Sequence, residues 1–263
     1  MGNHFFSYDK YALNFFGYPQ HGWLKMPKRE MSRYEIFHHI TRAKAIGENI
    51  MLIPGETTKM FLYQLSKKYN YNFNQVYNYY KGISPLEEGF LVPETYQIPV
   101  NSSYKQIVDL LVNFAKKKHR ATMLKLNIRT FKSWKRILTI ASIVEKESGD
   151  IKEMPLVASV VYNRLEKGMK LQMDGTLNYG FNSHKKVTPE MIRSDKSRYN
   201  TYRYKGLPPL PVSNPSGDAI DATLFPADTD YLYFMRIKGT KQHKFTDSYR
   251  EHLRNIKESR ESN

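Results

Sequence analysis

The sequence predicts an α+β chain divided into two domains, with a further segment ahead of them. Two features lead to this prediction. A short strand candidate followed by two helical tracts lies between residues 48 and 80. Two apolar helical tracts, 132–147 and 154–167, come later, ahead of a loop-rich region and a further strand candidate. The change between these two patterns places a domain boundary near residue 100.

The first 47 residues are predicted to be a structured lead-in. Aromatic and basic residues surround Tyr18–Trp23, and a helical tract runs from Ser32 to Ala45 with apolar residues at helical spacing. Glu48–Ile53 is then predicted to be a strand, because its second half is apolar and Pro54-Gly55 follows it. The first domain therefore starts at about residue 48.

Two helices and a strand-like stretch follow in the first domain. Thr57 or Thr58 can cap a helix, and a shorter aromatic helix is expected from Phe73 to Tyr80. The stretch Glu88–Pro99 has the composition of a strand and lies among Gly and Pro residues. The predicted order over residues 48–100 is strand, helix and helix, and then this stretch.

Three helices are predicted at the start of the second domain. Asn101–Ser103 caps a helix that runs to about Lys118. Lys132–Glu147 and Met154–Lys167 are predicted to be buried helices, each of which ends at a glycine. These two helices are the expected core of the domain.

The rest of the second domain is predicted to be rich in loops. Pro, Gly, Ser and Asn residues are frequent between residues 206 and 215. A short helix from Asp218 to Leu224 and a strand from Tyr231 to Ile237 are expected after them. Long ordered loops of this kind often carry functional residues.

The composition narrows the classes of chemistry that the chain can perform. It has 263 residues, a formal net charge of +16 and no cysteine, so disulfides, thiolate metal sites and thiol nucleophiles are excluded. The eight histidines have no metal-binding spacing, and no phosphate-binding or dinucleotide-binding loop is present, so no metal or cofactor is expected. No stretch approaches the roughly 20 apolar residues of a membrane span.

The positive charge attracts anionic polymers without selecting among them. The basic residues form short clusters such as Lys116–Lys118, with no zinc-finger spacing and no long basic arm. We therefore do not expect nucleic acid as the partner. Anionic membrane surfaces and the acidic peptides and lipids of a cell envelope remain as expected partners.

Two glutamates at the end of the predicted helix 132–147 are candidates for acid–base chemistry. A carboxyl group at the edge of a core has a raised pKa, which lets it donate a proton near neutral pH. Glu145 and Glu147 point about 200° apart on a helix, so they cannot act as a pair on one atom. Periodicity does not distinguish them, and both could also be solvated residues at a helix end.

Several ordered blocks of the chain resemble the YceG-like, or MltG, family of endolytic murein transglycosylases. The resemblance covers roughly residues 48 to 253 and is carried by these blocks: Glu88–Tyr96, Leu138–Glu147, Pro155–Leu165, Leu171–Thr176, Tyr199–Tyr202, Gly206–Pro209, Tyr231–Phe234 and His243–Phe245. Family members usually have Asp-Pro-Thr where this chain has Asp174-Gly175-Thr176, which predicts a less constrained turn here.

The resemblance implies a domain order and a catalytic residue. Residues 1–47 would be the lead-in, 48–100 a LysM-like subdomain and 101–258 the YceG-like catalytic domain. The second glutamate of the Glu-Lys-Glu block is catalytic in the family, and this position is Glu147 here. Candidates for holding the sugar are, in chain order, Gln172, Asp174, Thr176, Asn200 and Tyr202, although each could instead hydrogen bond to loop backbone.

The implied function is cleavage of the MurNAc–GlcNAc bond of nascent peptidoglycan, leaving 1,6-anhydroMurNAc ends and terminating glycan elongation. Peptidoglycan glycan strands and peptidoglycan synthases are the implied partners. The family is held at the bacterial inner membrane by one N-terminal helix, with the catalytic part in the periplasm, and we expect that anchor to be absent from this chain. The alternatives are a non-catalytic peptidoglycan-binding module and a basic nucleic-acid binder.

Overall fold

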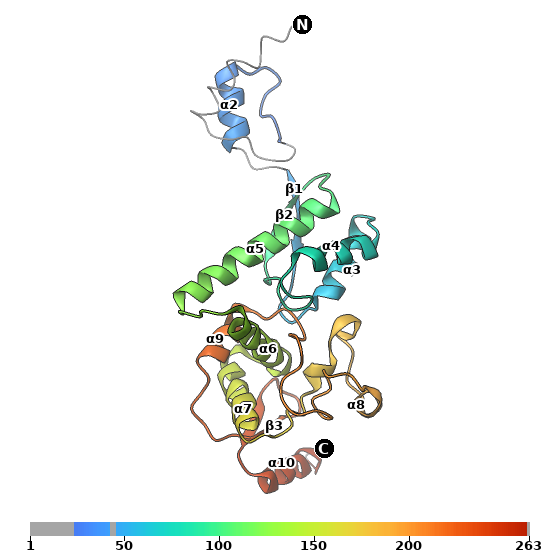
Figure 1. Cartoon of the computed structure of the whole chain (residues 1–263), viewed down its shortest axis with the longest axis vertical. Helices are drawn as coiled ribbons and strands as arrows, with labels where there is room; N and C mark the ends of the chain where they lie inside the picture. Colours follow the sequence, from blue (N-terminus) through green and yellow to red (C-terminus); the bar gives the residue numbers. More distant parts are fainter. Residues whose placement is uncertain (1–23, 43–45, 262–263) are drawn as a thin grey trace. The chain divides into compact units, whose positions relative to one another are not determined.

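The structure is a computed structural model that describes residues 24–42 and 46–261, with the backbone alone at Arg260. The predictions for Tyr18–Trp23 and for the end of the first helix at residues 43–45 lie outside the described residues. The fold is mixed α and β, as predicted (Figure 1). The chain divides into two compact units, and the domain ranges inferred from the resemblance stay a prediction.

The first unit contains the chain up to Met51 together with Thr95–Ile107. Its elements are α2 (Arg33–Arg42), β1 (Gly47–Met51) and β2 (Thr95–Pro99). Strands β1 and β2 are antiparallel, with Ile50 opposite Tyr96. Burial alternates along β2, as expected for a strand with one covered face.

The second strand is shorter than the predicted Glu88–Pro99. Residues 88–94 form a loop in which the N–H of Gly89 and the carbonyl of Phe90 bond to side chains and not to a neighbouring strand. The Glu88 carboxylate accepts hydrogen bonds from the backbone N–H groups of Thr58 (2.6 Å) and Gly89 (3.0 Å). Gly89 has φ +71° and packs against Pro211, whose Cβ atom would lie 2.3 Å from an added Cβ.

The second unit contains Leu52–Glu94 and the chain from Val108 onward. It begins with the two predicted helices, α3 (Thr58–Lys68) and α4 (Phe73–Ile83). Thr57 caps α3, since its Oγ1 atom accepts the backbone N–H of Met60 at 3.2 Å. Asn72 caps α4 in the same way.

Helix α5 (Tyr104–Lys125) starts at the predicted cap but continues beyond the predicted end at Lys118. Ser103 and Gln106 form a capping box, in which each side chain bonds to the other residue's backbone N–H. The helix ends where Asn127 adopts φ +54°.

The core of the second unit is built on α6 (Phe131–Glu147), α7 (Met154–Glu166) and α9 (Gly217–Leu224). The three helices pack against one another (Figure 1). Their contact is a cluster of fully buried aliphatic side chains, which extends into the loop at Leu171 and Met173. The prediction of two buried helices in this region is confirmed.

The remaining elements follow the core helices in chain order or connect them: η2 (Ile151–Glu153), η3 (Asp174–Leu177), η4 (Gly180–Asn182), α8 (Pro189–Ser194), β3 (Tyr233–Arg236), β4 (His243–Thr246) and α10 (Tyr249–Glu261). Strands β3 and β4 form an antiparallel hairpin on which α10 packs. Of these elements only β3 was predicted. In the described residues, no helix has the length and apolar character to cross a membrane.

Candidate active site

Helix α6 delivers its last residue, Glu147, to a cavity. Thr130 caps the helix, with its Oγ1 atom 3.1 Å from the backbone N–H of Ser133. The seven residues Leu138–Val144 are all buried, so the helix is fixed in the core on every side. It ends at Glu147 because Ser148 takes an extended conformation. A carboxylate at the end of so rigid a helix is held in a defined place.

The structure separates the two glutamates that periodicity could not distinguish. Glu145 accepts hydrogen bonds from the backbone N–H (2.9 Å) and Oγ (2.5 Å) of Ser216, the residue that caps α9. Glu147 Oε1 instead accepts the backbone N–H of Gly175 at 2.6 Å and lines the cavity. Glu145 therefore joins two helices, and Glu147 is the one of the two that a ligand in the cavity could reach.

The cavity has a volume of about 470 Å³ and is lined by residues from six parts of the second unit. Its walls are formed by α6, α7, η3 with the loop before it, the loop at Tyr202, the hairpin β3–β4 and α10. The lining residues are Glu147, Arg164, Leu171, Gln172, Met173, Asp174, Tyr202, Tyr233, Phe234, Met235, Arg236, His243, Tyr249 and His252. A mixture of two carboxyl groups, two arginines and several aromatic rings suits a polar ligand with flat apolar faces, such as a sugar.

The electrostatics of the cavity favour a protonated Glu147. Burial raises the pKa of Glu147 to about 7, and the negative charge of Asp174 adds to the rise, whereas the N–H of Gly175 and the charge of Arg164 lower it. The carboxyl group thus holds its proton up to near-neutral pH, which is the property of a general acid.

Gly175 is closely packed, which corrects the expectation of a less constrained turn. It lies in the 3-10 helix η3, and an added Cβ would lie 2.5 Å from Cβ of Lys146 and 3.0 Å from Oε1 of Glu147. The absence of a side chain lets the backbone approach the end of α6. Glycine, which has an N–H where proline has none, also supplies the hydrogen bond to Glu147.

Asp174 and Tyr202 form a pair at the wall of the cavity. The Tyr202 hydroxyl donates to Oδ1 of Asp174 at 2.6 Å. Burial raises the pKa of Tyr202, and its bond to Asp174 raises it further, so the hydroxyl stays protonated. Gln172 lies beside them with φ +51°, its backbone N–H donating to the carbonyl of Thr201 at 3.2 Å and its side chain exposed at the cavity.

Thr176 and Asn200 are fully buried and hold the loops around the cavity. Thr176 Oγ1 bonds to the carbonyl of Met173 (2.7 Å) and to Thr201 Oγ1 (2.9 Å). Asn200 Nδ2 donates to two carbonyls, and its Oδ1 accepts the N–H of Tyr202 at 3.1 Å. The structure thus gives both residues the second role that the sequence left open, which is to bond to loop backbone.

Arg164 is a cavity residue that the sequence analysis did not select. It lies on α7 and is 7% exposed, with its Nε atom 2.6 Å from the carbonyl of Leu232 and its Nη1 atom 2.6 Å from that of Leu171. Its Cζ atom also lies over the ring of Tyr233, 5.2 Å from the centroid of that ring. An arginine on the buried face of an apolar helix was the available signal, because such a charge must be compensated in the fold.

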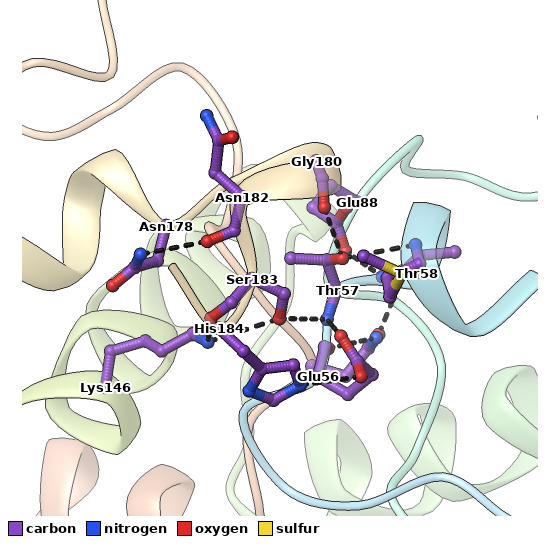
Figure 2. Close-up of polar contacts among 12 residues, drawn as sticks. Glu56, Thr57, Thr58, Glu88, Lys146, Asn178, Gly180, Asn182, Ser183 and His184 are labelled. Atoms are coloured by element: carbon purple, nitrogen blue, oxygen red, sulfur yellow. Dashed lines mark hydrogen bonds and ion pairs between the residues drawn. The ribbon is translucent and has the colours of Figure 1, made fainter. Parts of the chain in front are cut away.

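A polar cluster around Glu56 fixes the loop 178–184 next to the start of α3 (Figure 2). Glu56 is 3% exposed, and its Oε2 atom lies 2.8 Å from Nε2 of His184. Thr57 Oγ1 donates to the carbonyl of Gly180 at 2.6 Å. Contacts from two residues of the same turn therefore hold this loop.

Lys146 extends this cluster to the end of α6. Its Nζ atom donates to the carbonyl of Ser183 at 2.8 Å (Figure 2), so the residue next to Glu147 also bonds to this loop. Burial lowers the pKa of Lys146, and the charges of Glu56, Glu88 and Glu145 raise it. The end of α6 is therefore held by two contacts, with Gly175 and with Ser183.

Comparison with known proteins identifies relatives of this chain. A profile of the YceG-like family matches residues 7–258. An endolytic murein transglycosylase of Bacillus subtilis (strain 168) is 35% identical over 200 residues, covering 73% of this chain and 53% of that protein. One from Streptococcus pneumoniae (strain R6) is 32% identical over 180 residues, covering 65% of this chain and 32% of that protein.

A solved structure has the same fold. The crystal structure of a yceG-like protein from Listeria monocytogenes superposes with a TM-score of 0.68 at 27% identity, covering 86% of this chain and 81% of that one. The chain spans about half the length of the Bacillus relative and about a third of the Streptococcus relative. The family match extends over nearly all of the sequence, and the chain belongs to the YceG-like family.

Proposed function

We propose that this chain is the catalytic part of an endolytic murein transglycosylase and that Glu147 is its catalytic residue. The observation that carries the proposal is the position of Glu147 in a cavity of about 470 Å³, with burial raising its pKa to about 7. The curated relatives named endolytic murein transglycosylase support the reaction class. The proposed substrate is the glycan strand of peptidoglycan.

The proposed reaction needs one carboxyl group that acts twice. Protonated Glu147 gives its proton to the oxygen that links MurNAc to GlcNAc, and the bond from the MurNAc anomeric carbon to that oxygen breaks. The resulting carboxylate then takes the proton of the MurNAc 6-hydroxyl, whose oxygen bonds to the anomeric carbon. The products are a 1,6-anhydroMurNAc end and a free GlcNAc hydroxyl, and no water is consumed.

Three side chains at the cavity are proposed to contact the sugar. Asp174 carries negative charge that would stabilise the oxocarbenium-like transition state, and Tyr202 holds it in place through the 2.6 Å hydrogen bond. The exposed amide of Gln172 can donate to or accept from sugar hydroxyls. Thr176 and Asn200 are proposed to act only indirectly, by positioning the loops that carry these residues.

We also propose a biological setting from family membership. The enzyme would terminate growing glycan strands next to peptidoglycan synthases, at the periplasmic face of the inner membrane, where an N-terminal anchor would hold it. Co-purification of the anchored protein with a synthase from membranes would test the partnership. Isolation of the synthase without this protein would contradict it.

The reaction itself is tested on purified peptidoglycan, with mass spectrometry of the released fragments. Anhydro ends are the expected product. Reducing ends would mean that water is the acceptor and that the enzyme is a hydrolase. Binding without any new ends would favour the alternative of a non-catalytic peptidoglycan-binding module.

The pH dependence of the rate is the first prediction that follows. Since Glu147 must be protonated to start the reaction, and its pKa is raised to about 7, the rate should be high below neutral pH and fall about tenfold per pH unit above it. The initial rate of anhydro-end formation, measured from about pH 5 to about pH 9, gives this fall as the alkaline limb of the pH–rate profile. A limb near pH 4.5, the ordinary value for glutamate, would contradict the assignment.

The replacement Asp174→Asn should move that limb. The charge of Asp174 raises the pKa of Glu147, so its removal should shift the alkaline limb to lower pH, in addition to any loss of maximal rate. Asp228→Asn removes the same charge at an exposed position that does not line the cavity, and it should leave the limb in place. Equal shifts in the two variants would argue against a local effect of Asp174.

A further inference from the structure

The segment from Leu110 to Val144 has an unusual charge composition. It contains nine Lys and Arg residues and no Asp or Glu. The proposed reaction uses none of the nine. Eight of them are exposed in the structure: Lys116, Lys117, Lys118, Arg120, Lys125, Arg129, Lys132 and Arg136. Because this stretch itself contains no carboxylate to offset them, these charges favour a positive potential here.

Apolar side chains lie among these charges, around a groove of about 490 Å³. The groove lies along the end of α5 and the turn before α6, and its apolar lining includes Phe90, Met123, Ile128 and Phe131. Leu124 stands at its edge with 72% of its surface exposed. A large aliphatic residue so exposed within a cationic surface is typical of helices that lie in the headgroup region of a membrane.

The floor of the groove is neutral although a histidine contributes to it. His119 is buried, with its Nε2 atom 2.8 Å from the carbonyl of Phe90 and its ring 4.8 Å from the Phe90 ring. Burial lowers the pKa of His119, so it adds no charge to the apolar floor. The cations Lys116, Arg120 and Arg129 stand at the rim. Cationic rim and apolar floor together match the phosphate and the acyl chain of a phospholipid.

The turn that presents this surface is closed by its own hydrogen bonds. The backbone N–H of Ile128 donates to the carbonyl of Met123 at 2.8 Å, and that of Asn127 to Leu124 at 3.2 Å. These backbone donors are used, so an added peptide strand would have none of them to bind. This favours a partner that is recognised by charge and apolar burial.

We propose that the end of α5 and the turn 126–132 form a contact surface for an anionic phospholipid bilayer. Lys116, Arg120 and Arg129 bind lipid phosphates, and Leu124 enters the headgroup region. The long aliphatic parts of the basic side chains allow their charged ends to remain at the phosphates while the turn approaches the apolar layer. The inference does not depend on the role of Glu147.

Cosedimentation of the whole chain with vesicles tests the proposal. Vesicles of phosphatidylcholine mixed with equal phosphatidylglycerol should bind the chain, and pure phosphatidylcholine vesicles should not. The triple variant Lys116→Glu, Arg120→Glu, Arg129→Glu should reduce the bound fraction by at least about tenfold. The same change in net charge at exposed Lys152, Lys167 and Lys170 is the matched control, and it should keep most of the binding.

A second variant separates bilayer contact from attraction between net charges. Leu124→Ser keeps every charge and should still reduce binding severalfold, because it removes the side chain that enters the headgroup region. Equal losses in the two triple variants, or full binding by Leu124→Ser, would overturn the proposal. Binding to an acidic peptide such as poly-glutamate but not to anionic vesicles would overturn it in favour of an acidic protein partner. Circular dichroism of each variant checks that the fold is kept.

Discussion

Replacing Glu147 by Gln is expected to lower the rate of anhydro-end formation by at least about 10³-fold. The amide has no proton to give to the glycosidic oxygen, and as the weaker base it cannot take one from the 6-hydroxyl. Because Gln has nearly the same shape, its oxygen can keep the 2.6 Å bond to the N–H of Gly175. Mass spectrometry of peptidoglycan digested by the wild type and the variant measures the loss.

The fold of this variant should be intact, and the sign of its stability change is a second check. The pKa of Glu147 is raised from 4.5 to about 7 in the folded state, so the stability contributed by its protonation is present at low pH and is lost as pH rises through about 7. The neutral amide has no such loss. Thermal unfolding above neutral pH should therefore show a melting temperature equal to or above that of the wild type.

Glu145→Gln is the matched control, because it makes the same replacement two residues earlier at the end of the same helix. Glu145 bonds to Ser216 at the start of α9 and does not line the cavity, so its replacement should weaken the fold modestly and leave cleavage in place. Full activity of Glu147→Gln together with loss of activity in Glu145→Gln would transfer the catalytic role to Glu145.

The sequence predicted the helices that bury an apolar face. The tracts 132–147 and 154–167 carry long, mainly aliphatic runs, and they became α6 and α7 with nearly the predicted ends. Helix α10 was missed because most of its positions are charged and its apolar positions are few, although Tyr249, Leu253 and Ile256 lie at helical spacing. Pairs such as Arg254 with Glu258 and Lys257 with Glu261 lie along it, and packing on the β3–β4 hairpin supplies the rest.

One helix and one strand have other ends in the structure than predicted, and each difference has a local cause. The helix after residue 103 was predicted to end at about Lys118, but it continues to Lys125 and ends only where Asn127 takes a left-handed conformation. The composition of residues 88–94 indicated a strand, whereas the buried carboxylate of Glu88 binds the N–H of Gly89 and that of Thr58 at the start of α3. Side-chain to backbone bonds of this kind leave no periodic pattern in the sequence.

The candidate site was only partly accessible from the sequence. A carboxylate at the end of a buried helix pointed to Glu145 or Glu147, and the resemblance chose Glu147. The walls of the cavity come from residues as distant in sequence as Arg164, Tyr202 and His252, which only the tertiary fold brings together. Thr176 and Asn200 show the converse, since blocks shared with a family include residues that hold loops as well as residues that face a ligand.

Replacement of Arg164 is expected to have a large effect on the stability of the fold. Its guanidinium joins α7 to the carbonyls of Leu171 and Leu232, at two walls of the cavity, from a site that is 7% exposed. Arg164→Met keeps the aliphatic bulk but leaves these buried carbonyls without a donor. We expect it to lower the free energy of unfolding by about 3 kcal/mol, because each charge-assisted hydrogen bond contributes about 1.5–3 kcal/mol.

Arg164→Lys distinguishes the role of the charge from that of the geometry. A single ammonium group keeps the positive charge near Glu147 but cannot reach two carbonyls in different directions as the planar guanidinium does. Urea unfolding should therefore place it between the wild type and Arg164→Met, and its pH–rate limb should stay closer to that of the wild type. In Arg164→Met the lost charge removes one factor that lowers the pKa of Glu147, so its limb should move to higher pH. If both variants unfold like the wild type, the cavity walls do not depend on Arg164, and its part in the site reduces to its charge.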